Sequence, residues 1–481
     1  MTTPDLHSLG QESSWEGIRA VVAGFGVSGF AAADSLLHLG ADVTVLDDSD
    51  DDKLREKGTL LEILGAEVHL GPGSTDKLPA DIDLVVTSPG WLASVPLLVA
   101  AAARQLPIWG EVELAWRLRG ENPAPWLAVT GTNGKTTTVQ MLDAMLRAEG
   151  LRSAAVGNVG VPILEAVMNP EGFDVLAVEL SSFQLHWSQS LSMEASVVLN
   201  VASDHLDWHG SPEAYAAAKG KIYENTRIAC VYNVQDPVTE ELVREADVIE
   251  GCRAIGFTLG IPGPGMIGLV DDAIADRAFI PGRSTSAAEL GSINDLTSQA
   301  PHHVANALAA AALARAHGVS ARAVRDGLRG FVPAAHRIAD VATVAGVRYV
   351  DDSKATNTHA AQASLQSFDS VVWIAGGLAK GASFDGLIEA TRNRIRGVVL
   401  LGRDRALIAD ALQRHAPDVR VVEVENGETD LMDRVVDAAA SLAQPGDTVL
   451  LAPGCASMDQ FANYAARGDA FTEAVGRLAK E

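Results

Sequence analysis

One glycine-rich segment has the residue types and spacing that hold a nucleotide triphosphate. An apolar run at 127–129 and Thr130 lead into Gly-Thr-Asn-Gly-Lys-Thr-Thr, and an amphipathic stretch follows at 139–149. This order predicts a strand, a tight loop and a helix N-terminus, where backbone N–H groups and the helix dipole meet phosphate oxygens. Lys135 would bring a positive charge to the β- and γ-phosphates, and the hydroxyl of Thr136 suits Mg²⁺. The candidate phosphate-binding residues are Gly131, Thr132, Asn133, Gly134, Lys135, Thr136 and Thr137.

The spacing differs from the usual phosphate-binding loop, because Val129 stands where that pattern has its first glycine. A glycine-rich structural turn is the alternative interpretation. The Lys-Thr-Thr at the predicted helix start favours the nucleotide site.

A second glycine pattern lies near the N-terminus, where Gly24-x-Gly26-x-x-Gly29 follows the predicted strand 18–23. Asp47 stands about twenty residues later at the end of the next predicted strand, as in dinucleotide-binding proteins. The same strand, close backbone approach and helix dipole would hold any pyrophosphate, so a redox cofactor and a UDP-sugar both stay open. The candidates at this crevice are Val27, Ser28, Asp47, Asp48, Ser88, Pro89 and Gly90.

Two side chains that follow predicted strands of the central region are candidate metal ligands. Glu179 ends the apolar run 175–178, and His205 lies in Asp204-His-Leu-Asp-Trp-His209, beyond the run 197–199. Carboxylate and imidazole groups suit a divalent cation beside phosphate. The alternatives are a solvated carboxylate and a solvated polar loop.

Residue type alone does not assign a role to the other polar side chains of the central region. Lys219 and Lys221 lie on a predicted helix at 215–224, where lysines are ordinarily surface groups. His302, His303 and Asn306 open a further predicted helix.

Three polar clusters follow predicted strands of the C-terminal region, at 351–357, 376–380 and 453–461. In an open parallel sheet, ligands bind beyond the carboxyl ends of the strands. Lys354 and Lys380, together with hydroxyl groups in these clusters, predict a site for a small anionic ligand.

The elements that would position these residues alternate between short apolar runs and longer amphipathic stretches, which predicts an α/β fold with mostly parallel sheets. We expect three domains: a Rossmann-like domain at 1–112, a P-loop-type ATPase domain with a parallel sheet at 113–333, and a second Rossmann-like domain at 334–481. The segment 258–300 is rich in Gly, Pro, Ser and Asp, and we expect it to be β-rich or irregular.

Composition excludes several classes of function. The net charge of −25 argues against a general binder of nucleic acid or of acidic membranes, since both need a basic face. Three cysteines are too few and too scattered for a disulfide framework. Residues 1–16 lack the pattern of a signal peptide, and no window approaches the ~18 apolar residues of a membrane span. We therefore expect a protein of the cytoplasm.

Together these motifs resemble the Mur ligases, ATP-dependent enzymes that add amino acids to the peptidoglycan precursor. Gly131-Thr-Asn-Gly-Lys-Thr-Thr137 is shared across that family and with folylpolyglutamate synthases. Three segments are similar to those of the branch that adds D-glutamate: Gly24-Phe-Gly-Val-Ser-Gly29, Asp352-Ser-Lys-Ala-Thr-Asn357 and Cys455-Ala-Ser-Met-Asp-Gln-Phe461. The resemblance spans about residues 17 to 475 and implies a UDP-sugar domain, an ATPase domain and an amino-acid domain that close on one another.

The resemblance also implies roles for individual residues. It makes Glu179 and His205 ligands of a second Mg²⁺, beside the ion expected at Thr136. Lys219 matches a lysine that the family carbamylates, a change that turns a cation into an anion with ligand oxygens and overrules the surface interpretation. The implied catalytic residues are Lys135, Lys219 and His205. The implied contacts are Asn306, Arg337 and Asp352 for ATP, Asn158 with Ser28, Asp47 and Ser88 for the sugar nucleotide, and Thr356, Lys380, Ser457 and Tyr464 for D-glutamate.

Two positions depart from the family pattern. Tyr464 stands where a phenylalanine is expected, so the aromatic ring is kept, and His302-His303 replaces a histidine-asparagine pair. The implied reaction, in a monomer, activates the L-alanine carboxylate of UDP-N-acetylmuramoyl-L-alanine as an acyl phosphate, which the amine of D-glutamate attacks. The alternatives are a Mur ligase for another amino acid, a folate-glutamate ligase, an NAD-dependent oxidoreductase and a non-catalytic nucleotide-binding scaffold.

Overall fold

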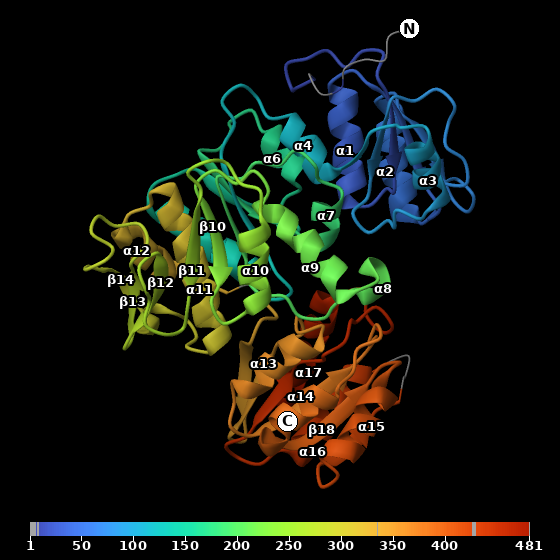
Figure 1. Cartoon of the computed structure of the whole chain (residues 1–481). Coiled ribbons are helices and arrows are strands. Elements are labelled where there is room, and N and C mark those ends of the chain that lie inside the picture. Colours follow the sequence, from blue (N-terminus) through green and yellow to red (C-terminus); the bar gives the residue numbers. More distant parts are fainter. Residues whose placement is uncertain (1–5, 7–8, 334, 426–429, 481) are drawn as a thin grey trace. The chain divides into compact units, whose positions relative to one another are not determined.

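The computed structural model describes residue 6 and residues 9–333, 335–425 and 430–480. The chain forms two compact units, one made of residues 1–201 and 211–331 and the other of residues 202–210 and 332–481. The first unit contains two sheets and the second contains one (Figure 1). Within the described ranges, no helix is long and apolar enough to cross a membrane. The predicted α/β class is confirmed.

The N-terminal sheet of the first unit has five parallel strands in the order β3-β2-β1-β4-β5. Chain order reverses between β1 and β4, so a crevice for ligands opens beyond the carboxyl ends of these two strands. The elements are β1 (Arg19–Ala23), α1 (Val27–His38), β2 (Asp42–Asp47), α2 (Asp52–Ile63), β3 (Glu67–Leu70), β4 (Leu84–Thr87), α3 (Pro96–Ala103), β5 (Ile108–Gly110) and α4 (Glu111–Arg117).

The second sheet of this unit has nine strands in the order β14-β13-β12-β11-β10-β9-β6-β8-β7. The strands from β12 to β7 in this order are parallel, with β6 between β8 and β9. The elements are β6 (Trp126–Thr130), α5 (Lys135–Ala148), β7 (Ser153–Gly157), α6 (Ile163–Val167), β8 (Val175–Glu179), α7 (Ser182–His186), β9 (Ala195–Val198), α9 (Pro212–Gly220), η2 (Lys221–Tyr223), β10 (Ala229–Asn233), α10 (Pro237–Glu245), β11 (Arg253–Phe257), β12 (Met266–Val270), β13 (Ala273–Asp276), β14 (Ala288–Ser292), η3 (Ile293–Asp295), α11 (Pro301–His317) and α12 (Ala321–Gly330).

The segment 258–300 supplies the last three strands of this sheet. β12 continues the parallel order beside β11, and β13 and β14 then pair antiparallel. The pairing of β13 with β14 shifts register between Ile274 and Ala275, and a turn-rich stretch separates the two strands. Short strands with irregular register give no clear alternation of apolar and polar residues, which is why the sequence pattern did not define them.

The second unit contains a six-stranded sheet in the order β15-β16-β20-β17-β18-β19. β15 and β16 form an antiparallel pair, and the remaining neighbours are parallel. The elements are α8 (Leu206–His209), β15 (Ala339–Val344), β16 (Val347–Asp351), α13 (Thr358–Gln366), β17 (Val371–Gly376), α14 (Asp385–Thr391), η4 (Arg392–Arg394), β18 (Ile395–Leu401), α15 (Arg405–His415), β19 (Arg420–Glu423), α16 (Leu431–Leu442), β20 (Thr448–Leu451) and α17 (Tyr464–Leu478).

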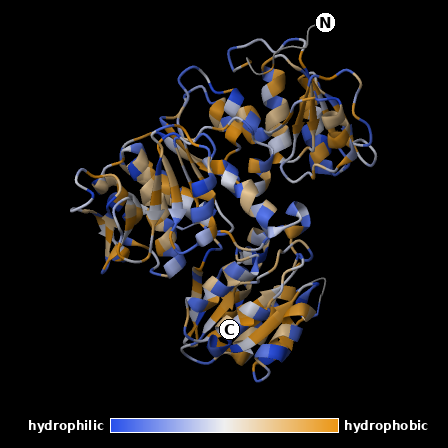
Figure 2. Ribbon diagram, in the orientation of Figure 1, coloured by the Kyte–Doolittle hydropathy of each residue, from blue (hydrophilic) through white to orange (hydrophobic). Residues whose placement is uncertain are grey.

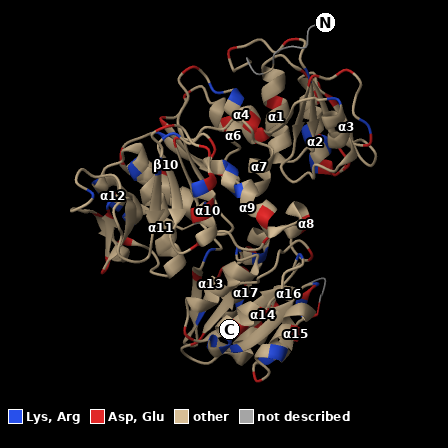
Figure 3. Ribbon diagram, in the orientation of Figure 1, with Lys and Arg blue, Asp and Glu red and all other residues tan. Residues whose placement is uncertain are grey.

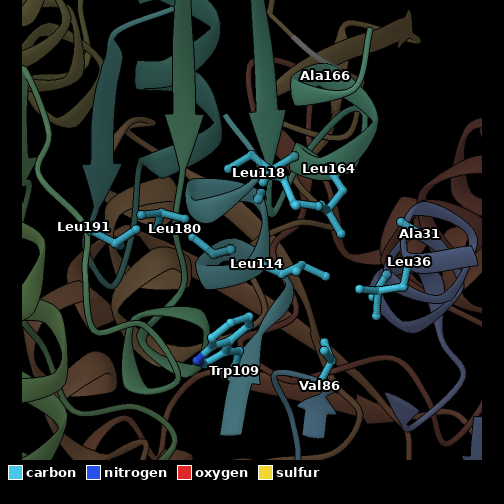
Figure 4. Close-up of a cluster of buried hydrophobic side chains, with 14 of the residues drawn as sticks. Ala31, Leu36, Val86, Trp109, Leu114, Leu118, Leu164, Ala166, Leu180 and Leu191 are labelled. Atoms are coloured by element: carbon cyan, nitrogen blue, oxygen red, sulfur yellow. The ribbon is translucent and has the colours of Figure 1, made fainter. Parts of the chain in front are cut away.

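The central strands of the sheets are nearly continuous apolar runs, as parallel strands covered on both faces require (Figure 2). Charged residues concentrate on helices and loops (Figure 3). One apolar cluster joins the two sheets of the first unit, because Trp109, Leu114 and Leu118 pack in the same core as Leu164 and Leu180 (Figure 4). This shared core gives the crevice of the N-terminal sheet and the glycine-rich loop one rigid support.

Candidate functional site

The glycine-rich loop joins the central strand β6 to the N-terminus of α5. Gly131 has φ of 153° and Gly134 is left-handed with φ of 86°, conformations that only glycine adopts without strain. Among the described residues, no side chain caps α5. The first turn of the helix, which contains Thr136 and Thr137, therefore presents its N–H groups and positive dipole end to an anion.

Two lysine side chains converge on this loop. Lys135 Nζ donates to the carbonyl oxygens of Gly131 and Thr132 at 2.8 and 3.0 Å, and Lys219 Nζ donates to the same Gly131 oxygen at 2.9 Å. Lys219 is 1% exposed, and its ammonium group lies 4.4 Å from the ring centroid of Tyr215. Two cations within hydrogen-bonding distance of one oxygen make this loop suited to an anion such as triphosphate. The surface interpretation of Lys219 is therefore wrong.

Asn200 holds the loop in shape from the segment that follows the neighbouring strand β9. Its side chain accepts from the Asn133 N–H at 2.9 Å and donates to the Asn133 carbonyl at 3.1 Å, and its own carbonyl accepts from Thr132 N–H at 2.9 Å. Sequence analysis did not select Asn200. The available signal was its place directly after an apolar strand, where the fold puts ligand-binding residues.

The helix α11 brings Asn306 against the loop. A Cβ on Gly134 would lie 2.3 Å from Asn306 Oδ1, so the amide fills the space beside the glycine. In the turn before Asn306, burial lowers the pKa of His302, and burial with repulsion from His302 lowers the pKa of His303 to about 4. His303 is therefore neutral at pH 7, and its Nε2 lies 3.2 Å from the Thr297 hydroxyl.

Glu179 lies at the end of β8, beside the loop. Its side chain is 1% exposed; Asn158 Nδ2 donates to Oε1 at 2.8 Å, and Oε2 has no hydrogen-bond partner within the described structure. A buried carboxylate oxygen without a partner is costly unless a cation balances it, so this group fits the predicted Mg²⁺. Asn158, predicted to contact the sugar nucleotide, lies beside Glu179.

His205 lies on the segment 202–210, which belongs to the second unit. The residue is left-handed, with φ of 53°, and its ring Nε2 lies 3.7 Å from Asp204 Oδ2. Asn357 Nδ2 donates to that same carboxylate oxygen at 3.3 Å, which ties the segment to the start of α13. Within the described ranges, no group of three or more His, Cys, Asp or Glu side chains forms a ready metal cluster. The role of His205 as a ligand stays a prediction.

The crevice of the N-terminal sheet is shaped by backbone contacts. Ser88 Oγ donates to the Gly24 carbonyl at 3.0 Å, and Asp47 accepts from the Phe25 N–H at 2.6 Å. Asp48 instead accepts from the Thr75 hydroxyl at 2.6 Å, and this bond lowers the pKa of the Asp48 carboxyl. Val27 is 67% exposed at the start of α1, and Pro89 and Gly90 follow β4.

Ser28 has a partner that the sequence did not indicate. Its hydroxyl donates to Glu111 Oε2 at 3.1 Å, and Glu111 Oε1 accepts from the Leu164 N–H at 3.1 Å. Burial raises the pKa of Glu111. Glu113, on the same helix and also buried, accepts from the N–H groups of Gln189 and Ser190 at 2.7 and 3.0 Å. The two glutamates of α4 thus fasten the first sheet to the second.

In the second unit, Asp352 follows β16 and is 8% exposed. Burial raises its pKa to about 7, against the lowering effects of the Ser364 hydroxyl, which donates to its Oδ2, and of the Arg337 charge. A buried carboxyl that titrates near neutrality suits hydrogen bonding to a polar ligand group.

The other C-terminal candidates lie at the carboxyl ends of neighbouring strands. Thr356 follows β16, Lys380 follows β17, and the buried Ser457 follows β20, so the sheet brings these three loops to one edge. Lys354 Nζ lies 3.8 Å from the ring centroid of Tyr464, and the role of Tyr464 at a D-glutamate site stays a prediction. Lys380 is left-handed, with φ of 49°.

Comparison with known proteins identifies the family. The models "Mur ligase MurD-like, N-terminal domain", "Mur ligase middle domain" and "Mur ligase, glutamate ligase domain" match residues 18–110, 129–314 and 336–455. A protein of Streptomyces avermitilis named UDP-N-acetylmuramoylalanine--D-glutamate ligase is 62% identical to this chain, and the alignment covers 97% of this chain and 99% of the relative. A protein of the same name from Thermobifida fusca is 56% identical, and the alignment covers 96% of this chain and 99% of the relative. This chain belongs to the Mur ligase family.

Solved Mur ligase structures share the fold at low identity. UDP-N-acetylmuramate-alanine ligase MurC from Thermotoga maritima aligns with a TM-score of 0.58 and 20% identity, covering 96% of this chain and 99% of that one. MurF from the same organism, in complex with ADP, aligns with a TM-score of 0.54 and 18% identity, covering 96% of this chain and 97% of that one. The predicted family and its α/β architecture with three sheets are thereby confirmed. Membership of the Mur ligase family implies that this enzyme depends on ATP.

Proposed function

We propose that this chain is the ligase that joins D-glutamate to UDP-N-acetylmuramoyl-L-alanine in peptidoglycan precursor synthesis. The observation that carries the proposal is its high identity, over nearly the whole chain, to relatives that bear this ligase name. The convergence of Lys135 and Lys219 on the glycine-rich loop supports the ATP-dependent half of the reaction. The proposed division of labour assigns the sugar nucleotide to residues 1–112, ATP to 113–333 and the amino acid to 334–481.

The reaction forms a peptide bond through an acyl phosphate. The L-alanine carboxylate attacks the γ-phosphate of ATP, and ADP leaves; the D-glutamate amine then attacks the acyl carbon, and phosphate leaves. Lys135 and the N–H groups at the start of α5 offset the charge that accumulates when the carboxylate and the triphosphate meet. The protein positions reactants and stabilises charge, so the chemistry needs no nucleophilic serine or cysteine.

The residues beside the loop fit a divalent cation. The Thr136 hydroxyl and the partnerless oxygen of Glu179 would hold Mg²⁺, with His205 as a further predicted ligand. When bound, Mg²⁺ withdraws charge from the phosphate oxygens and makes the γ-phosphate a better electrophile.

Carbamylation of Lys219 would change the charge balance of the loop. As an ammonium, Lys219 adds a second cation beside Lys135 and would repel Mg²⁺, whereas a carbamate supplies ligand oxygens. Incubation with ¹³C-bicarbonate should give a carbamate resonance in the wild-type chain and in Lys221→Arg, but not in Lys219→Arg. A spectrum without this resonance in the wild-type chain would leave Lys219 as an ammonium.

The substrate contacts complete the proposal. Ser28, Asp47 and Ser88 would face the uridine nucleotide, Asn306, Arg337 and Asp352 the ATP, and Thr356, Lys380, Ser457 and Tyr464 the D-glutamate. We expect a monomer that works in the cytoplasm.

Phosphate release tests the function directly. The chain is incubated with ATP, Mg²⁺ and UDP-N-acetylmuramoyl-L-alanine, and single amino acids are added in turn. We expect phosphate release only when the added amino acid is D-glutamate. Release with a different amino acid would make the chain a Mur ligase of another specificity, and the absence of release with every acceptor would overturn the ligase proposal.

A further inference from the structure

Two cysteines that are distant in sequence meet in the nine-stranded sheet. Cys230 Sγ and Cys252 Sγ lie 3.8 Å apart, and neither is part of a disulfide. Cys230 lies on β10 and is 2% exposed, whereas Cys252 directly precedes β11 and is half-buried.

The backbone holds this pair in place on both sides. Cys230 is opposite Ala254 in the β10–β11 register, and the Arg253 N–H donates to the Ile228 carbonyl at 3.1 Å. The Cys252 N–H is fixed by the Ile249 carbonyl at 3.0 Å. At 3.8 Å the two sulfurs are close to van der Waals contact, and they would have to approach to about 2.05 Å to form a disulfide.

The two thiols differ in reactivity. The hydrogen bond with Cys230 lowers the pKa of Cys252, and the same bond, with burial, raises the pKa of Cys230. Cys252 is also the more exposed of the two, so its thiolate is the group that an oxidant meets first.

We propose that Cys230 and Cys252 form a modification site at which hydrogen peroxide produces a reversible disulfide. The Cys252 thiolate attacks one peroxide oxygen, and the O–O bond breaks. Hydroxide leaves, and Cys252 becomes a sulfenic acid. The Cys230 sulfur then attacks the Cys252 sulfur, the S–O bond breaks, and the hydroxyl group of the sulfenic acid leaves with the Cys230 proton as water. Each sulfur loses one electron, and the peroxide accepts both.

The position of the pair limits the effect of the disulfide. Cys230 is the second residue of β10 and Cys252 precedes β11, so both lie at the amino-terminal edge of these parallel strands. The glycine-rich loop follows the carboxyl end of β6 at the opposite edge. The disulfide would close the β10–α10–β11 crossover and stabilise it. This proposal does not rest on the proposed function.

Peptide mapping tests the site in the full wild-type chain. After peroxide treatment and alkylation under denaturing conditions, we expect a linked Cys230–Cys252 peptide and one alkylated cysteine, Cys455; a reductant should restore all three thiols. Overoxidation of Cys252 beside an alkylated Cys230, or a link to Cys455 or to a second chain, would overturn the proposal.

Thermal melting provides the second measurement. The oxidised wild-type chain should melt a few degrees above the reduced chain, and Cys252→Ser should melt at one temperature with and without peroxide. An equal peroxide-dependent shift in Cys252→Ser would show that another group is modified.

Discussion

Asn158 Nδ2 donates a 2.8 Å hydrogen bond to Glu179 Oε1, while the second oxygen of this buried carboxylate accepts no hydrogen bond within the described structure. The amide fixes the rotation of the carboxylate, so that Oε2 has a set direction beside the glycine-rich loop. An arrangement with one oxygen held and one oxygen unpaired is what a metal-binding carboxylate needs.

Replacement of Glu179 by Gln tests this arrangement. The amide keeps the size of the side chain and a hydrogen-bond acceptor for Asn158 but removes the negative charge, so we expect substrate-dependent phosphate release to fall by about 100-fold or more. Thermal melting should show an intact fold, since the substitution removes a buried charge.

The matched control is Glu171→Gln, because Glu171 is an exposed acidic residue in the same unit. It should leave phosphate release within about twofold of the wild-type chain, as surface substitutions usually do. Full activity in Glu179→Gln at ordinary Mg²⁺ concentrations would remove this residue from the metal site.

Gly134→Ala tests the contact between the loop and α11. A Cβ there would lie 2.3 Å from Asn306 Oδ1 on a backbone with φ of 86°, so the substitution both strains the chain and displaces Asn306. We expect ATP affinity, measured by calorimetry, to fall by about tenfold or more, together with a backbone cost of about 1–2 kcal/mol.

Gly150→Ala separates strain from displacement. Gly150 has φ of 93°, but a Cβ there has no neighbour within 4 Å. Gly150→Ala should lower the melting temperature less than Gly134→Ala, which also displaces Asn306, while ATP affinity stays unchanged. A similar loss of ATP affinity in both variants would mean that strain alone is responsible.

The sequence predicted the residues that follow strands better than it predicted their partners. The apolar run before Glu179 and the Gly-Lys-Thr at Lys135 are local patterns, and both strands and the helix formed as expected. That strands β8 and β9 flank β6 depends on pairing across long sequence distances, which periodicity does not encode.

Asn200 and Glu111 were missed for the same reason. Both are polar residues beside strand ends, and each acquires its role from a partner on a distant segment: Asn133 for Asn200, and Ser28 with Leu164 for Glu111. A buried glutamate runs against the usual exposure of charged residues, so no residue-type argument selects it.

Asp352→Asn tests the pH dependence of stability. Because folding raises the pKa of Asp352 to about 7 from an ordinary value of 3.8, the folded state binds the proton more tightly than the unfolded state. The wild-type chain should therefore lose unfolding free energy relative to Asp352→Asn as pH rises from 4 to 7, by up to about 4 kcal/mol. Denaturant titrations of both chains across this range measure the difference, and a constant difference would show that Asp352 ionises normally.

Removal of the Glu111 carboxyl tests its link to the sugar-nucleotide crevice. Glu111→Ala leaves the Ser28 hydroxyl and the Leu164 N–H without their acceptor, at a cost of about 1–3 kcal/mol each, whereas Glu111→Gln keeps an acceptor oxygen and removes the buried charge. If Glu111 orients Ser28 toward the sugar nucleotide, Glu111→Ala should raise the KM for UDP-N-acetylmuramoyl-L-alanine several-fold with kcat nearly unchanged.

Ser28→Ala should produce a similar rise in KM, and the double variant should be no worse than the more affected single one, because the two residues act through one hydrogen bond. The KM for ATP serves as the internal control and should stay constant in all three chains. Additive effects of the two substitutions on the sugar-nucleotide KM would show that Glu111 supports the crevice by a route other than Ser28.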